Sequence, residues 1–216
     1  MSSWSQFAAM SGLAYYVGPP RPANPVLLLH SWHGLNAATK KLADRLADEG
    51  CTVLVPDLLS EALPSSQAEA EAVLGAVDPN HLVSATLGGL EVLGNSAPGP
   101  ATVLGLGMGG SLALWLSVRR PERVVAVVSF YGTQTIDFAG SRARYQLHMA
   151  EKDPWVSSDD AAFMEATMGL EGIEFETFRY PGTSPGFFEE GNHFAADAAD
   201  LAWSRTLTVL QSVRVN

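Results

Sequence analysis

Residues that could carry out chemistry surround a glycine-rich turn with the sequence Gly105-Leu-Gly-Met-Gly-Gly110. A short apolar run precedes this turn and a helical run follows it, which is the layout of a nucleophile elbow. The central residue of such an elbow projects a nucleophilic side chain into the site, but here that residue is Gly107. The flanking glycines suit a corner where strand and helix backbones approach closely. The sequence therefore predicts a scaffold for covalent catalysis that lacks its reactive atom.

Four other side chains could support acid–base or nucleophilic catalysis. His33 follows an apolar run, and it could act as a general acid or base or be a hydrogen-bonded loop residue. Ser31 could serve as a substitute nucleophile if a histidine reaches it. Asp153 could orient His33, His193 or a substrate group, or it could anchor its own loop through backbone N–H groups. His193 is interpreted as a surface residue, with a relocated catalytic base as the alternative.

Aromatic residues follow several of the predicted strands and could line a pocket for an apolar or aromatic carbonyl compound. The alternative is ordinary packing of these loops against the sheet. The residues concerned are Trp32, Tyr131, Trp155, Phe187 and Phe188.

The sequence gives no sign of a metal site or a cofactor site. Its histidines and acidic residues lack metal-ligand spacing, and the glycines of the turn lack the spacing of a dinucleotide-binding loop. Cys51 and His148 fall within predicted strands and are interpreted as core residues. We therefore expect no metal and no cofactor.

Alternating apolar runs and amphipathic segments predict the elements that position these residues. Strands are expected at 26–30, 51–55, 101–106, 124–130, 145–149 and 175–180, and helices at 36–49, 66–75, 80–93, 109–119, 158–168 and 197–213. The last helix is expected to turn five residues inward, which are Leu201, Trp203, Leu207, Thr208 and Leu210. Strands that alternate with helices form a parallel sheet covered on both faces, in an open, doubly wound α/β fold. Ligands bind outside the carboxyl ends of such strands, where the candidate residues lie.

The composition fits a single domain over residues 1–216 and restricts its partners. A hydrophobic fraction of 47% with 17% charged residues is typical of a globular chain. The net charge of −10 argues against a nucleic-acid binder and, more weakly, against anionic membrane surfaces. The sequence shows neither an apolar stretch long enough to span a membrane nor a signal peptide. We expect a cytoplasmic protein that binds a small molecule, in an oligomeric state that the sequence does not indicate.

A series of motifs falls on the predicted strand ends. They are Leu29-His-Ser-Trp-His-Gly-Leu-Asn36, Val55-Pro-Asp-Leu58, Gly105-Leu-Gly-Met-Gly-Gly110, Ser129-Phe-Tyr-Gly132, His148-Met-Ala-Glu-Lys-Asp-Pro-Trp-Val156, Tyr180-Pro-Gly-Thr-Ser-Pro-Gly-Phe-Phe188 and Ala202-Trp-Ser-Arg-Thr-Leu207. This ordered set resembles the dienelactone hydrolase family over nearly the whole chain after about Pro25. The resemblance implies an α/β-hydrolase fold, with one mostly parallel sheet and helices on both faces.

The resemblance also implies a catalytic triad of cysteine or serine, aspartate and histidine. The family nucleophile falls on Gly107, the acid on Asp153 and the histidine on Pro185. A glutamate that some members carry falls on Ser31. Loss of the nucleophile or the histidine lowers kcat on the order of 10⁶-fold in a well-studied serine protease. The resemblance thus predicts a replaced triad and an abandoned covalent mechanism.

Main-chain groups of the implied site do not depend on side chains. The N–H groups of Trp32 and Met108 match the family's oxyanion-hole donors. Our leading hypothesis is an enzyme that binds a small carbonyl compound and catalyses non-covalent acid–base chemistry, such as isomerisation, elimination or cyclisation. A second hypothesis is hydrolysis of an ester or lactone by Ser31, or by a water held by His33 and Asp153. A third is a pseudoenzyme that binds a ligand or partner without turnover.

Overall fold

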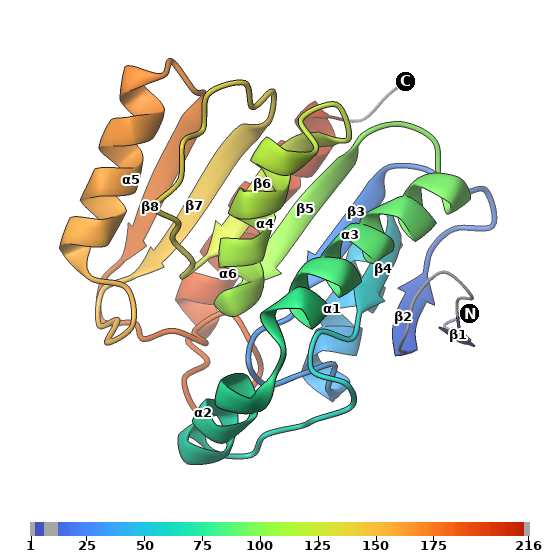
Figure 1. The fold of residues 1–216 in the computed structure, drawn as a ribbon, viewed down its shortest axis with the longest axis horizontal. Coiled ribbons are helices and arrows are strands. Elements are labelled where there is room, and N and C mark those ends of the chain that lie inside the picture. The colour runs from blue at the N-terminus through green and yellow to red at the C-terminus, as the bar shows by residue number, and fades with distance from the viewer. Residues whose placement is uncertain (1–2, 7–12, 214–216) are drawn as a thin grey trace.

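The apolar runs of the sequence lie side by side in one sheet (Figure 1). The computed structural model describes residues 3–6 and 13–213, and its strands follow the order β1-β2-β4-β3-β5-β6-β7-β8. They span Ser3–Gln6 (β1), Leu13–Val17 (β2), Pro25–Leu29 (β3), Thr52–Pro56 (β4), Ala101–Leu106 (β5), Val124–Phe130 (β6), Arg144–Ala150 (β7) and Phe175–Tyr180 (β8). β2 pairs antiparallel with β1 and β4, whereas every pair from β4 to β8 is parallel.

The register of the central strands brings their carboxyl ends to one edge of the sheet. Leu29 at the end of β3 pairs with Gly105 of β5, and Leu106 at the end of β5 pairs with Phe130 of β6. β3, β4 and β5 are buried along their whole length, which explains their continuous apolar sequences. The loops that leave β3, β5 and β6 therefore start close to one another.

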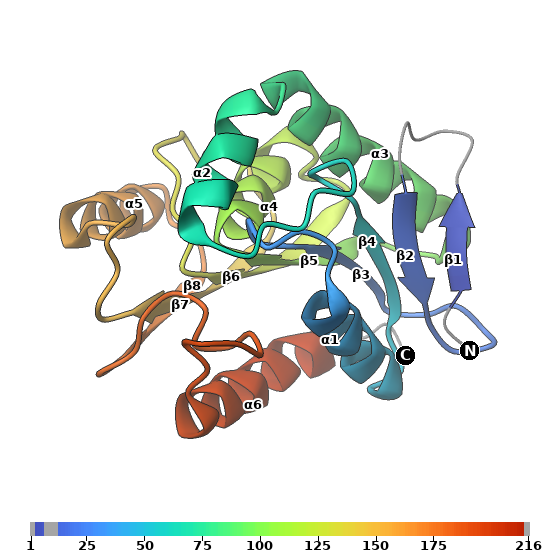
Figure 2. The ribbon, with the colours of Figure 1, turned by 90° about the horizontal axis from the view of Figure 1, so that it is seen from below.

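Helices cover both faces of this sheet (Figure 2). They span Ala37–Asp48 (α1), Gln67–Ala76 (α2), Pro79–Ser96 (α3), Met108–Arg119 (α4), Ser158–Leu170 (α5) and Ala196–Ser212 (α6). α3, α4 and α5 contribute to one set of buried side chains, and α1 and α6 contribute to a second set. Asn36 caps α1 by accepting the N–H of Thr39 at 2.9 Å, and Gly50 follows the helix with φ 82°.

The predicted doubly wound sheet is confirmed, and each predicted strand and helix is present with ends that differ by at most three residues. The expectation for the last helix was wrong at Leu201, which is 48% exposed, and at Thr208, which is also exposed. It was confirmed at Trp203 and Leu210, which are buried, and the inward face of α6 also carries Ala202 and Thr206. The edge strand β1 and its neighbour β2 were not predicted.

Candidate active site

The glycine-rich turn forms a sharp corner between β5 and α4. Gly107 has φ 53° and ψ −116°, and its N–H donates to the carbonyl of Phe130 at 2.9 Å. A Cβ atom placed on Gly107 would lie 3.8 Å from the Cβ of Ser31 and 3.9 Å from the ring of Tyr131. A Cβ on Gly109 would overlap the carbonyl oxygen of Leu29. The corner therefore admits a side chain at residue 107, and that side chain would face Ser31 and Tyr131.

A carboxylate that the sequence analysis missed lies beside this corner. Ser31 donates its hydroxyl to Glu189 Oε1 at 2.7 Å, and Tyr131 donates its hydroxyl to Glu189 Oε2 at 3.0 Å. Glu189 belongs to the loop between β8 and α6, and it comes within hydrogen-bond distance of a serine 158 positions earlier in the chain. We call Ser31, Tyr131 and Glu189 the Glu189 cluster.

Tyr131 holds the cluster together from the end of β6. Its φ of 41° is unusual for a residue with a side chain, and such conformations concentrate at functional sites. Burial, the charge of Glu189 and the hydrogen bond to it raise the pKa of the Tyr131 hydroxyl well above its ordinary value. The backbone N–H groups of Gly186 and Phe188 also contact this hydroxyl. Tyr131 therefore stays protonated and fixes both the carboxylate and the loop that carries it.

Two backbone N–H groups beside the corner are free to bind a ligand oxygen. Among the described residues, neither the N–H of Trp32 nor that of Met108 donates a hydrogen bond. Met108 begins α4, where the first N–H groups of a helix have no intrahelical acceptor and carry partial positive charge. Trp32 directly follows Ser31, and Met108 directly follows Gly107, so both N–H groups belong to residues next to the corner. Their role as oxyanion-hole donors, which the resemblance implies, stays a prediction.

The two candidate histidines lie at the border of this site. The His33 ring stacks on Trp32 with 4.4 Å between ring centroids, and the His33 N–H lies 3.4 Å from Ser31 Oγ. His193 is exposed, and its Cβ would lie 3.6 Å from a Cβ on Gly186. Neither ring forms a hydrogen bond within the described part of the chain. A catalytic role for either histidine stays a prediction.

Asp153 anchors its own loop. Its Oδ1 accepts the N–H of Trp155 at 2.8 Å and that of Val156 at 3.0 Å. No histidine forms a hydrogen bond or an ion pair with Asp153 in the ranges that the structure describes. The geometry matches the loop-anchor alternative, and Pro185, the position implied for the histidine, lies half-buried in the loop after β8.

The aromatic residues expected around a pocket divide into different environments. Phe187 is fully buried and packs against Tyr131 and Tyr180, while Phe188 stacks on Phe130 at 4.1 Å. Trp155 is 57% exposed. Tyr131 and Trp32 border the corner, whereas Phe187 and Phe188 belong to the packed core, as the alternative of ordinary loop packing expects.

A cavity of about 230 Å³ lies at the opposite end of the strands, lined by residues that precede or begin β3 and β5 and by the end of α6. The described ranges contain no group of three or more histidine, cysteine or acidic residues arranged to hold a metal. None of the described helices is long and apolar enough to cross a lipid bilayer.

Comparisons with known proteins agree with this fold. The sequence model of the dienelactone hydrolase family matches residues 13–214. The chain is 25% identical over 189 residues to a protein of Aquifex aeolicus named "Putative carboxymethylenebutenolidase", covering 81% of each chain. It is 27% identical over 223 residues to a Bradyrhizobium protein named "Probable 2-oxo-3-(5-oxofuran-2-ylidene)propanoate lactonase", covering 93% of this chain and 89% of the relative.

Solved structures give the same result for the fold. A dienelactone hydrolase-like promiscuous phosphotriesterase from metagenomic libraries superposes with a TM-score of 0.85 at 18% identity, covering 100% of this chain and 99% of that one. At this identity the likeness supports the fold alone, which is that of the α/β hydrolases. The match of the family model over almost the whole described chain settles the classification. This chain belongs to the dienelactone hydrolase family.

Proposed function

We propose that this protein hydrolyses a small lactone or ester by acid–base catalysis at the Glu189 cluster, without a covalent acyl-enzyme. The observation that carries the proposal is the position of the Glu189 carboxylate. This carboxylate accepts hydrogen bonds from Ser31 and Tyr131. These are also the two residues nearest to a Cβ atom placed on Gly107. A general base in this position can act on a water molecule at the corner, where the family mechanism would use an enzyme nucleophile.

The reaction can be written with the groups present. The substrate carbonyl oxygen accepts hydrogen bonds from the N–H groups of Trp32 and Met108, which stabilise the negative charge that develops on it. Water adds to the carbonyl carbon while Glu189 accepts one of its protons. The tetrahedral intermediate then breaks its bond to the ester or ring oxygen, and the proton passes from Glu189 to that oxygen. The products are a carboxylic acid and an alcohol, joined in one molecule when the substrate is a lactone.

The substrate class rests on the relatives and on the donor pair at the corner. One relative is named as a lactonase, and the two free N–H groups suit a carbonyl oxygen. The same carboxylate could instead remove a proton from the carbon beside a carbonyl, as isomerisation or elimination requires. Those reactions and cyclisation stay predictions that product analysis of the same assays can detect.

The test compares two adjacent glutamates. Glu189→Gln removes the base but keeps a similar shape, whereas Glu190→Gln removes an exposed charge that pairs with Lys41 at 2.6 Å. With dihydrocoumarin and 4-nitrophenyl acetate as substrates, we expect Glu189→Gln to lower kcat by about 100-fold or more. Glu190→Gln should stay within about threefold of the wild type, as surface charges usually contribute little. Equal kcat values for the two variants would rule out Glu189 as the base.

A second candidate mechanism uses Ser31 as a covalent nucleophile, because its hydroxyl already donates to Glu189 at 2.7 Å. Rapid mixing with 4-nitrophenyl acetate separates the two mechanisms. Water attack predicts no burst of 4-nitrophenol, no acylated protein by mass spectrometry and residual turnover in Ser31→Ala. A burst of about one equivalent that disappears in Ser31→Ala would instead assign the nucleophile to Ser31. Ligand binding without turnover of any lactone or ester would favour a pseudoenzyme.

A further inference from the structure

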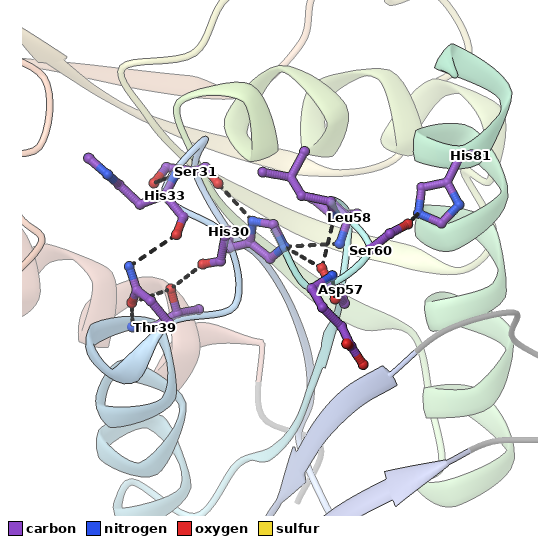
Figure 3. A network of polar contacts seen from close by, with 12 residues as sticks. His30, Ser31, His33, Thr39, Asp57, Leu58, Ser60 and His81 are labelled. Atoms are coloured by element: carbon purple, nitrogen blue, oxygen red, sulfur yellow. Dashed lines mark hydrogen bonds and ion pairs between the residues drawn. The ribbon is translucent and has the colours of Figure 1, made fainter. Parts of the chain in front are cut away.

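A buried histidine joins the loops that leave β3 and β4 (Figure 3). His30 is fully buried, and its Nδ1 lies 2.7 Å from the carbonyl oxygen of Ser31. Its Nε2 lies 2.9 Å from the backbone nitrogen of Leu58. Both partners of the ring are therefore main-chain groups, one of them in the loop that carries Trp32.

These two contacts define the protonation state of His30. The backbone N–H of Leu58 can only donate, so Nε2 must offer its lone pair. The carbonyl of Ser31 can only accept, so Nδ1 must carry the hydrogen. The Asp57 carboxylate is 3.8 Å from Nε2, which is too long for a hydrogen bond, and it accepts the N–H groups of Leu59 and Glu61 instead. His30 is thus neutral, in the tautomer with hydrogen on Nδ1.

The bond from His30 to Ser31 has a consequence for the oxyanion site. The carbonyl of Ser31 and the N–H of Trp32 belong to one planar trans peptide and point in opposite directions. A donor that fixes the direction of the carbonyl therefore fixes the direction of the N–H. Gly34 also donates to this carbonyl at 3.1 Å, but that bond lies within the same turn. His30 ties the peptide to the neighbouring strand end through Leu58.

We propose that His30 is a positioning residue that aims the Trp32 N–H at the carbonyl oxygen of the bound substrate. The expected effect on turnover rests on the proposed function. The control of the Trp32 N–H direction by His30 does not depend on turnover. His30 is too deeply buried to touch the substrate, so it acts through the peptide of Ser31 and Trp32.

Two amide variants separate the two hydrogen bonds of the ring. In His30→Asn the amide nitrogen falls near the position of Nδ1, so it keeps the donor to Ser31 but loses the acceptor for Leu58. In His30→Gln the amide oxygen falls near Nε2, so it keeps the acceptor for Leu58 but loses the donor. We expect His30→Gln to lower kcat by about tenfold to 100-fold with KM changed less than about twofold, since misplacement of a catalytic group is costly. His30→Asn should keep kcat within about threefold.

A loss of kcat that is equal in both variants and follows their folded fraction would reduce His30 to a purely structural residue. A second measurement needs no variant. Nitrogen NMR of the wild-type protein should show hydrogen on Nδ1 of His30, and hydrogen on Nε2 or on both nitrogens would overturn the proposal.

A third measurement separates this inference from the proposed function. On addition of γ-butyrolactone, the Trp32 amide resonance should shift in the wild type and in His30→Asn, and it should shift much less in His30→Gln. If the Trp32 shifts follow this pattern but the protein hydrolyses no lactone or ester, the proposed function is refuted and the positioning role of His30 stands. Absence of a Trp32 shift in the wild type, or an equal shift in His30→Gln, would refute the positioning role.

Discussion

His148 makes the stability of this fold sensitive to acid. The residue lies in β7, fully buried, with Nε2 2.9 Å from Gln146 Oε1 and Nδ1 2.6 Å from the Tyr180 hydroxyl. The Gln146 oxygen accepts the Nε2 hydrogen, so Nδ1 accepts the hydroxyl hydrogen of Tyr180, whose oxygen in turn accepts from Arg205 at 3.1 Å. Burial, followed by the charge of Arg205, lowers the pKa of His148 from 6.5 to about 3.

The sign and size of the effect follow from proton linkage. Because the pKa is lower in the folded state, the unfolded chain binds more protons between about pH 3 and pH 6.5, and stability rises with pH in that range. Each pH unit within this window is worth about 1.4 kcal/mol. Acidification from pH 7 to pH 4 should therefore cost about 3 kcal/mol through His148 alone. Above pH 7 the residue is neutral in both states and contributes no pH dependence.

The assay is urea unfolding of the wild type and of His148→Gln at pH 7 and pH 4. The packing cost of the substitution appears at both pH values and cancels when the losses on acidification are compared. We expect the wild type to lose about 3 kcal/mol more than the variant. His81→Gln, which removes a histidine at the protein surface, is the matched control and should follow the wild type. An equal loss in His148→Gln, or an NMR titration of His148 near its ordinary pKa, would refute the reasoning.

Three further outcomes test other parts of the structure. Gly107→Ala should cost about 1–3 kcal/mol, because φ is 53° and ψ −116° but the new Cβ is not crowded. Gly109→Ala, which would overlap the carbonyl of Leu29, should cost more in urea unfolding, and equal losses would contradict the corner geometry. Burial raises the pKa of the Asp57 carboxyl, but the hydrogen bonds that it accepts from the N–H groups of Leu59 and Glu61 act in the opposite direction, and the pKa is lowered overall. The stability advantage of the wild type over Asp57→Asn in urea unfolding should therefore be present at pH 6 and shrink as the pH falls below about 4. The variant Gly107→Ser with Pro185→His should gain esterase activity toward 4-nitrophenyl acetate, and a folded but inert double variant would show that the loop geometry no longer supports a triad.

The central sheet could be predicted from the sequence because buried parallel strands are continuous apolar runs between turn residues. The strand β2, Leu13–Val17, is also largely apolar, but its role depends on antiparallel pairing with β4, some 40 residues away. Local sequence does not encode that pairing. The face of α6 was misread at Leu201 for a similar reason, because the set of inward residues depends on how the helix lies against β6 and β7.

The candidate site could be predicted where residues directly follow strands. Ser31, Gly107 and Tyr131 each lie within two residues of a strand end, so parallel pairing alone brings them together. Glu189 could not be found in this way, because it lies nine residues beyond β8 and next to a second glutamate. Sequence offers no local signal that distinguishes the pair. The folded loop distinguishes them, since Glu189 binds Ser31 while Glu190 binds Lys41 on the surface.

The burial of two phenylalanines explains how a carboxylate from the far side of the sheet reaches the corner. β8 is separated from β3 by three strands, so pairing alone would leave the loop after β8 far from Ser31. Phe187 and Phe188 pack into the core around Phe130 and thereby draw this loop back across the strand ends. The next residue is Glu189, which therefore arrives beside the position where the family resemblance implies a glutamate at residue 31. A carboxylate at the corner can thus be supplied by either loop, and the absence of a glutamate at residue 31 does not leave the site without one.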